Sequence, residues 1–243
     1  MLKRKVNMPT ILTQLSTEPL TAERTWTVEE IPVLTASISL PTPAEGAERA
    51  ARRIRRYYQL QSRSFLRYCE RWLLPAAETE YRAALASSAP LPSFRAELEY
   101  HVTYNESGLW SLYTQSRERG ADGRTLLTRR GDTWDLTSGY PVPLAAFFPR
   151  RSGWKRKLLA TAEAEIRRRE AAGAARWNEN WRRELRRRFN PENFYLTADG
   201  LAFFYPMYAL APASAGIPVF TVPYAGEGPI SPGINEGEKT PPA

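Results

Sequence analysis

A long run of helical periodicity followed by strict alternation constrains the fold of this 243-residue chain most. Apolar side chains recur every three or four residues over 44–74, which predicts an amphipathic helix there. A longer alternative continues to Ala86 past a kink at Pro75. From Pro92 apolar and polar residues alternate, as in a half-buried strand. The predicted buried face of the helix consists of Ala50, Ile54, Tyr57, Tyr58, Phe65, Tyr68, Cys69 and Trp72.

The alternating region predicts an antiparallel β-meander, and other short runs predict further strands. Asn105–Gly108 supplies a turn inside the meander, and Asp199-Gly200 is a strong signal for a short hairpin. A run of β-forming residues that begins near Pro32 predicts an upstream strand, which Pro41 and Pro43 end. The predicted strands cover residues 31–40, 94–102, 109–117, 124–136, 194–196, 201–205 and 217–222.

Two more helices are predicted between the meander and the hairpin, after a single helical turn over residues 144–148. The first covers Trp154–Ala171, and the second follows Gly173, where apolar residues recur every four positions up to Phe189. The predicted fold is therefore α+β, an antiparallel sheet with packed helices in two lobes. Its predicted divisions are a flexible lead-in (1–27), an N-terminal lobe with the long helix and meander (28–140), a C-terminal lobe (141–225) and a disordered tail (226–243).

The chain is basic, with 34 Lys and Arg against 26 Asp and Glu and a net charge of +8. A balance of this kind suits nucleic acid, an anionic cell-wall polymer or an acidic protein, although solvated helix faces explain it equally simply. One arginine stripe follows the long helix, and a second basic surface follows the two later helices. The stripe contains Arg49, Arg53, Arg56, Arg63, Arg67 and Arg71; the second surface contains Arg167–Arg169, Arg182, Arg183 and Arg186–Arg188.

Residues with catalytic chemistry are sparse, so we expect no enzyme activity and no cofactor. Cys69 is the only cysteine and fits a small apolar helix position. His101, the only histidine, stands inside an alternating strand, where a structural role is the commoner one. Asp132 and Asp135 fit loop capping better than two-carboxylate hydrolysis. A hydrolase that uses these two aspartates is the least favoured of three hypotheses.

No stretch approaches the roughly 18 consecutive apolar residues of a membrane helix, so we expect no membrane insertion. The residues that follow Lys3-Arg4-Lys5 are interrupted by polar side chains and proline, so they lack the apolar core of a signal peptide. These patterns predict a cytoplasmic protein, with association with the cell envelope as the alternative.

Aromatic residues crowd the segment 194–224. Proline beside tyrosine at Pro206-Met207-Tyr208 gives a rigid amphipathic projection of the kind that anchors protein interfaces. An aromatic core beneath a loop is the alternative interpretation. If the segment does bind a partner, the predicted contact residues are Tyr205, Pro206, Tyr208, Pro212 and Gly216.

The order of residues over 194–212 and 215–224 resembles the C-terminal part of the RsiV-like domain. Earlier pieces follow the same order, namely Ile31-Pro32-Val33 before a long helix, the run 100–105, and the run 134–139. The resemblance covers roughly residues 28–225. Members include lysozyme-sensing anti-sigma factors and the accessory domains of certain peptidoglycan deacetylases. The sensors have a membrane helix, which is not seen here, and the family's Gly-Gly-Ala-His loop is matched here by Arg119-Gly120-Ala121-Asp122.

The resemblance implies a two-lobed α+β domain that binds a protein, either lysozyme or a regulatory partner. Lysozymes are basic, so long-range electrostatics oppose their encounter with a chain of charge +8. The leading hypothesis is therefore a non-catalytic RsiV-like protein-binding domain with an unspecified partner. The second hypothesis is a basic domain that binds nucleic acid or another anionic polymer through its arginine-rich helix faces.

Overall fold

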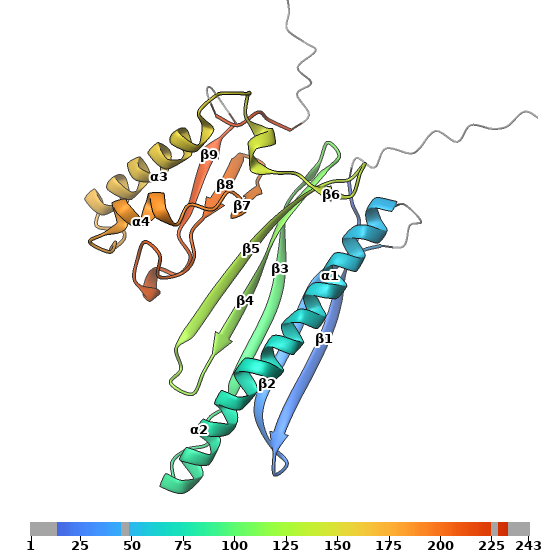
Figure 1. Ribbon diagram of the computed structural model, residues 1–243, viewed down its shortest axis with the longest axis vertical. Helices are drawn as coiled ribbons and strands as arrows, with labels where there is room; N and C mark the ends of the chain where they lie inside the picture. Colours follow the sequence, from blue (N-terminus) through green and yellow to red (C-terminus); the bar gives the residue numbers. More distant parts are fainter. Residues whose placement is uncertain (1–13, 45–48, 225–227, 233–243) are drawn as a thin grey trace, which may run out of the picture.

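Two β-sheets lie face to face between two layers of helices in the computed structural model, which describes residues 14–44, 49–224 and 228–232 (Figure 1). The predicted α+β class is confirmed. The N-terminal elements are β1 (Thr17–Val28), β2 (Ile31–Pro43), α1 (Arg49–Tyr68), the π-helical turn η1 (Cys69–Leu73), α2 (Leu74–Ser87), β3 (Phe94–Glu106), β4 (Leu109–Arg119), β5 (Thr125–Asp135) and β6 (Tyr140–Pro141). The remaining elements are the 3-10 turn η2 (Leu144–Phe147), α3 (Trp154–Ala171), α4 (Trp181–Arg187), β7 (Phe194–Leu196), β8 (Gly200–Phe204), the 3-10 turn η3 (Ala213–Ala215) and β9 (Val219–Pro223).

The long helix does continue past Pro75, as the longer alternative predicted. The irregularity is a π-turn just before the proline, in which the Leu74 N–H donates to the Cys69 carbonyl. This turn adds about one residue to the helical repeat. The buried stripe therefore moves from Cys69 to Ala77 and Tyr81. The prediction that Tyr68 and Trp72 are buried is wrong, because these side chains are 36 % and 63 % exposed.

The six-stranded sheet has the order β1-β2-β3-β4-β5-β6. All its pairs are antiparallel except β2 with β3, which run parallel because the long helix carries the chain back along the sheet between them. The predicted sheet was antiparallel throughout, so this pair is a correction.

The prediction of a flexible lead-in over 1–27 is wrong for the part that forms β1. Ala22, Trp26 and Val28 recur at alternate or fourth positions and pack against the core, which gives β1 one apolar face. The strand pairs with β2 along its whole length. Residues 1–13 lie outside the described part of the chain.

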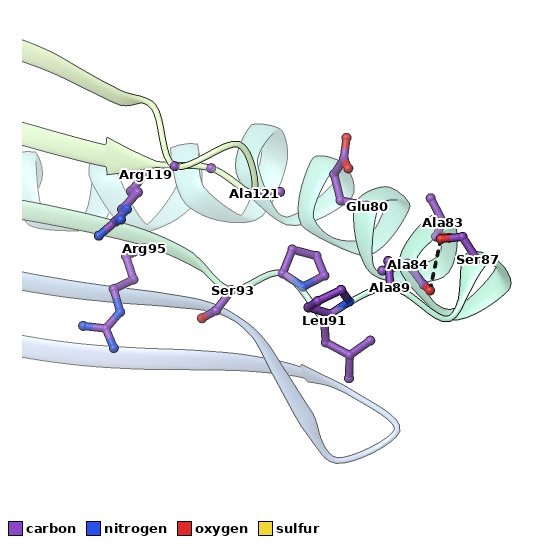
Figure 2. Close-up of a pocket in the computed structure, with 14 residues that line it drawn as sticks. Glu80, Ala83, Ala84, Ser87, Ala89, Leu91, Ser93, Arg95, Arg119 and Ala121 are labelled. Carbon is purple, nitrogen blue, oxygen red and sulfur yellow. Dashed lines mark hydrogen bonds between the residues drawn. The ribbon is translucent and has the colours of Figure 1, made fainter. Parts of the chain in front are cut away.

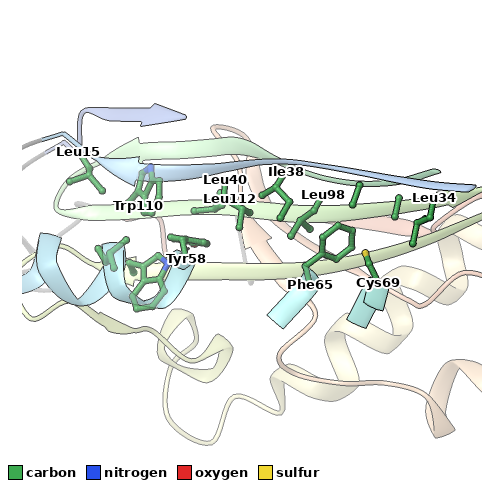
Figure 3. Close-up of a cluster of buried hydrophobic side chains, with 14 of the residues drawn as sticks. Leu15, Leu34, Ile38, Leu40, Tyr58, Phe65, Cys69, Leu98, Trp110 and Leu112 are labelled. Carbon is green, nitrogen blue, oxygen red and sulfur yellow. Dashed lines mark hydrogen bonds between the residues drawn. The ribbon is translucent and has the colours of Figure 1, made fainter. Parts of the chain in front are cut away.

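A hydrophobic core fills the space between α1–α2 and the six-stranded sheet (Figure 3). Tyr58 lies at one end of it, edge-on to Trp110 with ring centroids 5.9 Å apart. Phe65 and Cys69 continue the same helix face over β2 and β3. Burial raises the pKa of the Cys69 thiol to about 12, so this cysteine is the apolar helix residue that its spacing predicts.

The second sheet, with the order β7-β8-β9, packs α3 and α4 on one face and the six-stranded sheet on the other. The α3 helix has the predicted bounds, but α4 begins at Trp181 rather than soon after Gly173. The Asn178 N–H donates to the Leu210 carbonyl at 2.9 Å, and Trp177 stacks on Phe220. These tertiary contacts hold residues 174–178 in an extended form.

The two sheets approach closely where β7 crosses β5. A Cβ atom added at Gly131 would overlap the carbonyl oxygen of Phe194, so only glycine fits there. The Leu196 N–H donates to the buried Ser111 hydroxyl at 2.8 Å across the same junction. These contacts join the two lobes through backbone atoms.

Part of the predicted disordered tail is placed against the fold. The Ile230 N–H donates to the Phe147 carbonyl at 2.7 Å, and Pro229 is buried. The prediction is therefore wrong for residues 228–232, because a backbone hydrogen bond fixes them. Residues 225–227 and 233–243 lie outside the described part of the chain.

Candidate functional site

The predicted contact surface lies on the loop that joins β8 to β9, and the structure divides its five residues. Tyr205 is 1 % exposed, and its hydroxyl donates to the Leu185 carbonyl at 2.8 Å. Because β8 is covered on both faces, the residue that follows it is core, and the prediction that Tyr205 forms part of an exposed surface is wrong. Pro206, Tyr208 and Pro212 are exposed, and Gly216 is partly exposed.

The backbone of Tyr208 has an unusual conformation, although the side chain is exposed. Its φ of +67° lies in the left-handed region, which costs a non-glycine residue about 1 kcal/mol or more. The side chain is nevertheless 49 % exposed. The loop is held from behind, because the Asn178 side-chain amide donates to the Tyr208 carbonyl at 3.3 Å. A tyrosine is therefore presented to solvent by a backbone that the surrounding structure fixes.

The β4–β5 hairpin of the other lobe forms the second half of this surface. The Leu127 N–H points at the Met207 sulfur, 3.3 Å away, so the loop covers the free edge of β5. Tyr208, Leu126 and Phe94 line one shallow pocket of about 180 Å³. Leu126 is itself 42 % exposed, so the pocket joins two exposed apolar side chains from the two lobes. We call Tyr208, Leu126 and the exposed Pro206 the Tyr208 surface.

Leu126 and Met207 were missed as site residues at the sequence level. The available signal was a leucine at the outward-facing position of a strand otherwise flanked by polar residues, in the run Thr125-Leu126-Leu127-Thr128. Two adjacent leucines cannot both face the same side of a strand, so one of them had to face out.

Asp132 is enclosed between α1 and β5 rather than placed at a strand end. Its carboxylate accepts hydrogen bonds from Tyr57 at 2.9 Å, Tyr58 at 3.3 Å and Arg130 at 3.3 Å. Burial raises the pKa of this carboxyl, and Arg130 and the tyrosine hydroxyls offset part of that effect. The Trp134 indole N–H in turn donates to the Tyr58 hydroxyl at 3.0 Å. Asp132 and Tyr58 are buried between helix and sheet, whereas the Arg130 side chain is 62 % exposed.

Asp135 points elsewhere and caps a turn, as its spacing predicts. It accepts hydrogen bonds from the Thr137 N–H at 2.9 Å and the Ser138 hydroxyl at 2.7 Å. The structure therefore does not bring Asp132 and Asp135 together. His101 lies exposed on β3, with its ring 4.8 Å from that of Tyr113 and its Nε2 3.5 Å from Glu99. Within the described ranges no cluster of three His, Cys, Asp or Glu side chains is placed to hold a metal ion.

The two basic surfaces differ in how their charges are balanced. On α3, Glu165 pairs with Arg168 and Arg169, and Glu163 pairs with Arg167. On α4, the buried Glu184 carboxylate pairs with Arg183, Arg187 and Arg188 at 2.5–3.3 Å. The α1 sequence, in contrast, contains seven arginines and no acidic residue.

Figure 2 shows a groove of about 550 Å³ at the far end of α2. Small side chains of α2 and the connection to β3 line one side of it, and Arg95 and Arg119 line the other. The Ser87 hydroxyl donates to the Ala83 carbonyl at 2.9 Å. The groove therefore offers two cations, the single carboxylate of Glu80 and two serine hydroxyls, with no His or Cys in its lining.

Taken together, the layers define a two-sheet α+β domain with surface sites. Residues 145–225 match the model of a family described as a protein of unknown function, DUF3298. DUF3298 domains are structurally related to RsiV-like domains, so the resemblance seen in the sequence is supported at that coarser level. No helix among the described residues is both long and apolar enough to cross a membrane.

Two solved structures share the fold over most of its length. A DUF3298 family member from Bacteroides fragilis superposes with a TM-score of 0.63 at 14 % identity, over 88 % of this chain and 92 % of the other. A DUF3298 family protein from Pseudomonas aeruginosa gives 0.58 at 18 % identity, over 88 % and 93 %. The coverage extends the likeness beyond the matched segment to the N-terminal lobe. No curated protein sequence matches the chain.

Proposed function

We propose that this chain is a non-catalytic RsiV-like protein-binding domain whose partner docks on the Tyr208 surface. One observation carries the proposal: an exposed tyrosine is held at a positive φ beside an exposed leucine of the other lobe. Backbone strain of this kind persists where the surrounding structure enforces it, and it concentrates at sites of recognition.

The geometry favours binding because the anchor is ordered in advance. Met207 and Asn178 fix the loop on both sides of Tyr208, so a partner orders few additional torsions when it binds. Tyrosine is also one of the residues that most often carry the binding energy of protein interfaces. The sealed position of Asp132 and the capping role of Asp135 support the non-catalytic part of the proposal.

The surroundings of the Tyr208 surface suggest the chemistry of the partner. Arg95, Arg119 and Arg124 line the same shallow pocket, together with a single acidic residue, Glu118. An apolar anchor ringed by cations suits a partner whose contact surface is acidic. This agrees with the net charge of +8 and opposes a basic lysozyme at long range.

Site-specific cross-linking tests the surface. A photoreactive phenylalanine analogue at position 208 should capture a partner in cells, whereas the same analogue at the exposed Val102 should not. The captured partner should then bind Tyr208→Ala about tenfold more weakly or worse in calorimetry, as expected for a central tyrosine anchor. Equal cross-linking at both positions, or unchanged affinity of Tyr208→Ala and Pro206→Ala, would show that the surface is wrongly assigned.

Two further measurements sharpen the test. Tyr208→Gly removes the side chain but relieves the strain, so it should raise thermal stability while it weakens binding as much as Tyr208→Ala. Lysozyme is titrated separately. If lysozyme binds, its affinity should increase with salt, because salt screens the repulsion between two basic proteins.

A further inference from the structure

The solvent face of α1 presents cations that no carboxylate in the described part of the chain neutralises. Among the described residues no carboxylate lies within 4 Å of Arg52, Arg56 or Arg63, and all three side chains are exposed. Arg52 and Arg56 are four residues apart, so they lie on one face, where like charges repel. An anion bound between these side chains would reduce the repulsion, so this face favours anion binding.

These side chains form a groove rather than a set of scattered charges. Arg52, Arg55, Arg56, Gln59, Leu60 and Arg63 line a groove of about 370 Å³ along the helix. The Arg55 guanidinium donates to the Pro43 carbonyl at 2.9 Å, which fixes one wall. The twelve residues from Arg52 to Arg63 are separated by eleven steps and rise about 16 Å along the helix, so the groove is long enough for several contacts with a linear ligand.

The side chains that line the groove include groups that can bind a phosphate and groups that can contact the ring of a nucleobase. A guanidinium offers planar, paired N–H donors that match a phosphate and a flat face that stacks on a base. Leu60 is 50 % exposed between these arginines, and Gln59 adds an amide that can donate and accept. A bare chain of phosphates would use neither residue, whereas a nucleotide has an apolar ring face and polar ring edges.

An aromatic platform lies beside the same helix. The Arg53 guanidinium sits over the Tyr140 ring, 4.2 Å from its centroid, and donates to the Ser138 carbonyl at 2.6 Å. Tyr140 is exposed, so its ring is accessible next to the arginine stripe. Cations that follow a backbone and rings that stack bases are the two components of single-strand binding sites.

We propose that the α1 face, lined by Arg52, Arg56, Leu60 and Arg63, binds single-stranded nucleic acid through its phosphates and bases. This site is separate from the Tyr208 surface, which lies on the loop between β8 and β9 and on the β4–β5 hairpin. The paired arginines of the second basic surface take no part, because Glu163, Glu165 and Glu184 already neutralise them; they are Arg167, Arg168, Arg169, Arg183, Arg187 and Arg188.

Fluorescence anisotropy with a labelled 12-nucleotide oligothymidylate tests the proposal in the full chain. Arg56→Gln/Arg63→Gln should bind at least tenfold more weakly than the wild type at low salt. Its plot of log affinity against log salt should be shallower by about 1.4, at about 0.7 for each lost phosphate contact. Arg167→Gln/Arg168→Gln removes the same charge from α3 and should stay within about twofold of the wild type. Equal losses in the two variants would overturn the α1 site.

Two competitors separate a nucleotide site from a general anion site. The wild type should prefer oligothymidylate to an abasic strand of equal length, and Leu60→Gln should reduce that preference while it leaves the salt dependence unchanged. Stronger binding of heparin, of a glycerol phosphate polymer or of a 12-base-pair duplex would overturn the proposal, as would the absence of salt-dependent binding. Because these side chains are exposed, each variant should keep the wild-type circular dichroism spectrum.

Discussion

The arginines of α1 and those of α3–α4 are alike in sequence density and different in environment. On α3 and α4 the acidic residues stand three or four positions from their arginines, the spacing at which helical side chains meet. On α1 no acidic residue occurs in twenty positions. The comparison teaches that arginine counts alone predict a basic surface poorly. The positions of the glutamates decide which surface keeps its charge.

Glu184 is the centre of the neutralised region. Glu184 is a residue of α4 whose side chain is 5 % exposed, and hydrogen bonds from Arg187, Arg188 and Arg183 lower its pKa to about 2. On α3, hydrogen bonds from Arg168 and Arg169 lower the pKa of Glu165 to about 2 as well. These arginines therefore serve the fold, whereas Arg52, Arg56 and Arg63 of α1 are available to a ligand.

The largest effect is expected from Glu184→Gln. This variant leaves three arginines crowded around a neutral side chain, so the midpoint of thermal unfolding should fall by several degrees. Glu163→Gln, which breaks one pair on α3, is the matched control and should change the midpoint much less. A Glu184→Gln protein as stable as the wild type would mean that the α4 ion pairs are as dispensable as the charges of α1.

A smaller effect with the opposite pH dependence is expected from Asp132→Asn. Burial raises the pKa of Asp132 above its ordinary 3.8, so folding favours the protonated form, and this group's contribution to stability falls as pH rises from 3.8 through the raised value. The variant should therefore gain stability relative to the wild type as pH increases through that window. Glu184 behaves in reverse, because its contribution is present above 4.5 and lost as pH falls toward 2.

Urea unfolding of the wild type, Asp132→Asn and Glu184→Gln at a series of pH values measures both signs. The free energy of unfolding of Asp132→Asn minus that of the wild type should rise with pH. The same difference for Glu184→Gln should fall as pH rises between about 2 and 4.5. Parallel curves for the two variants would contradict the assigned shifts.

The smallest effect is expected from Arg56→Gln/Arg63→Gln on the free protein. Removing two cations from α1 relieves like-charge repulsion along the helix, so the free energy of unfolding should rise by about 0.3 kcal/mol at low salt. The gain should vanish at about 1 M salt, where exposed charges are screened. Arg167→Gln/Arg168→Gln should have the opposite sign, because those arginines have partners. A loss of stability in the α1 variant would reveal a partner for Arg56 or Arg63.

Much of the fold could be predicted because most elements have one apolar face. The bounds of α3 and the start of β4 agree with the sequence prediction to the residue, since the period of the apolar positions sets them. The parallel pairing of β2 with β3 could not be predicted in this way, because alternation indicates that a segment is a strand but not which strand it pairs with or in which direction. Similarly, β1 carries Glu and Arg between its apolar positions, which hides the alternation of Ala22, Trp26 and Val28.

The candidate surface was predictable only in part. The exposure of Pro206 and Tyr208 follows from a proline-rich loop after a hairpin. The paired leucines of β5 indicate that one of them faces out, but no local pattern indicates that β5 lies beside that loop, which is a tertiary contact. Tyr205 was placed wrongly because one hairpin face was expected to be open, whereas helices cover one face of β8 and the larger sheet covers the other.

The unbroken passage from α1 to α2 also determines where the molecule ends. The 39 residues from Arg49 to Ser87 rise about 58 Å as a helix. The 13 residues of β2 extend only about 43 Å as a strand. A helix of this length cannot stop level with every strand, and α2 extends past the β4–β5 hairpin (Figure 1). The connection that brings the chain back from this overhang to β3 encloses the groove of Figure 2. The groove thus results from the difference in length between the α1–α2 helix and the strands. Shortening α2 by one turn should close the groove without disturbing the core beneath α1.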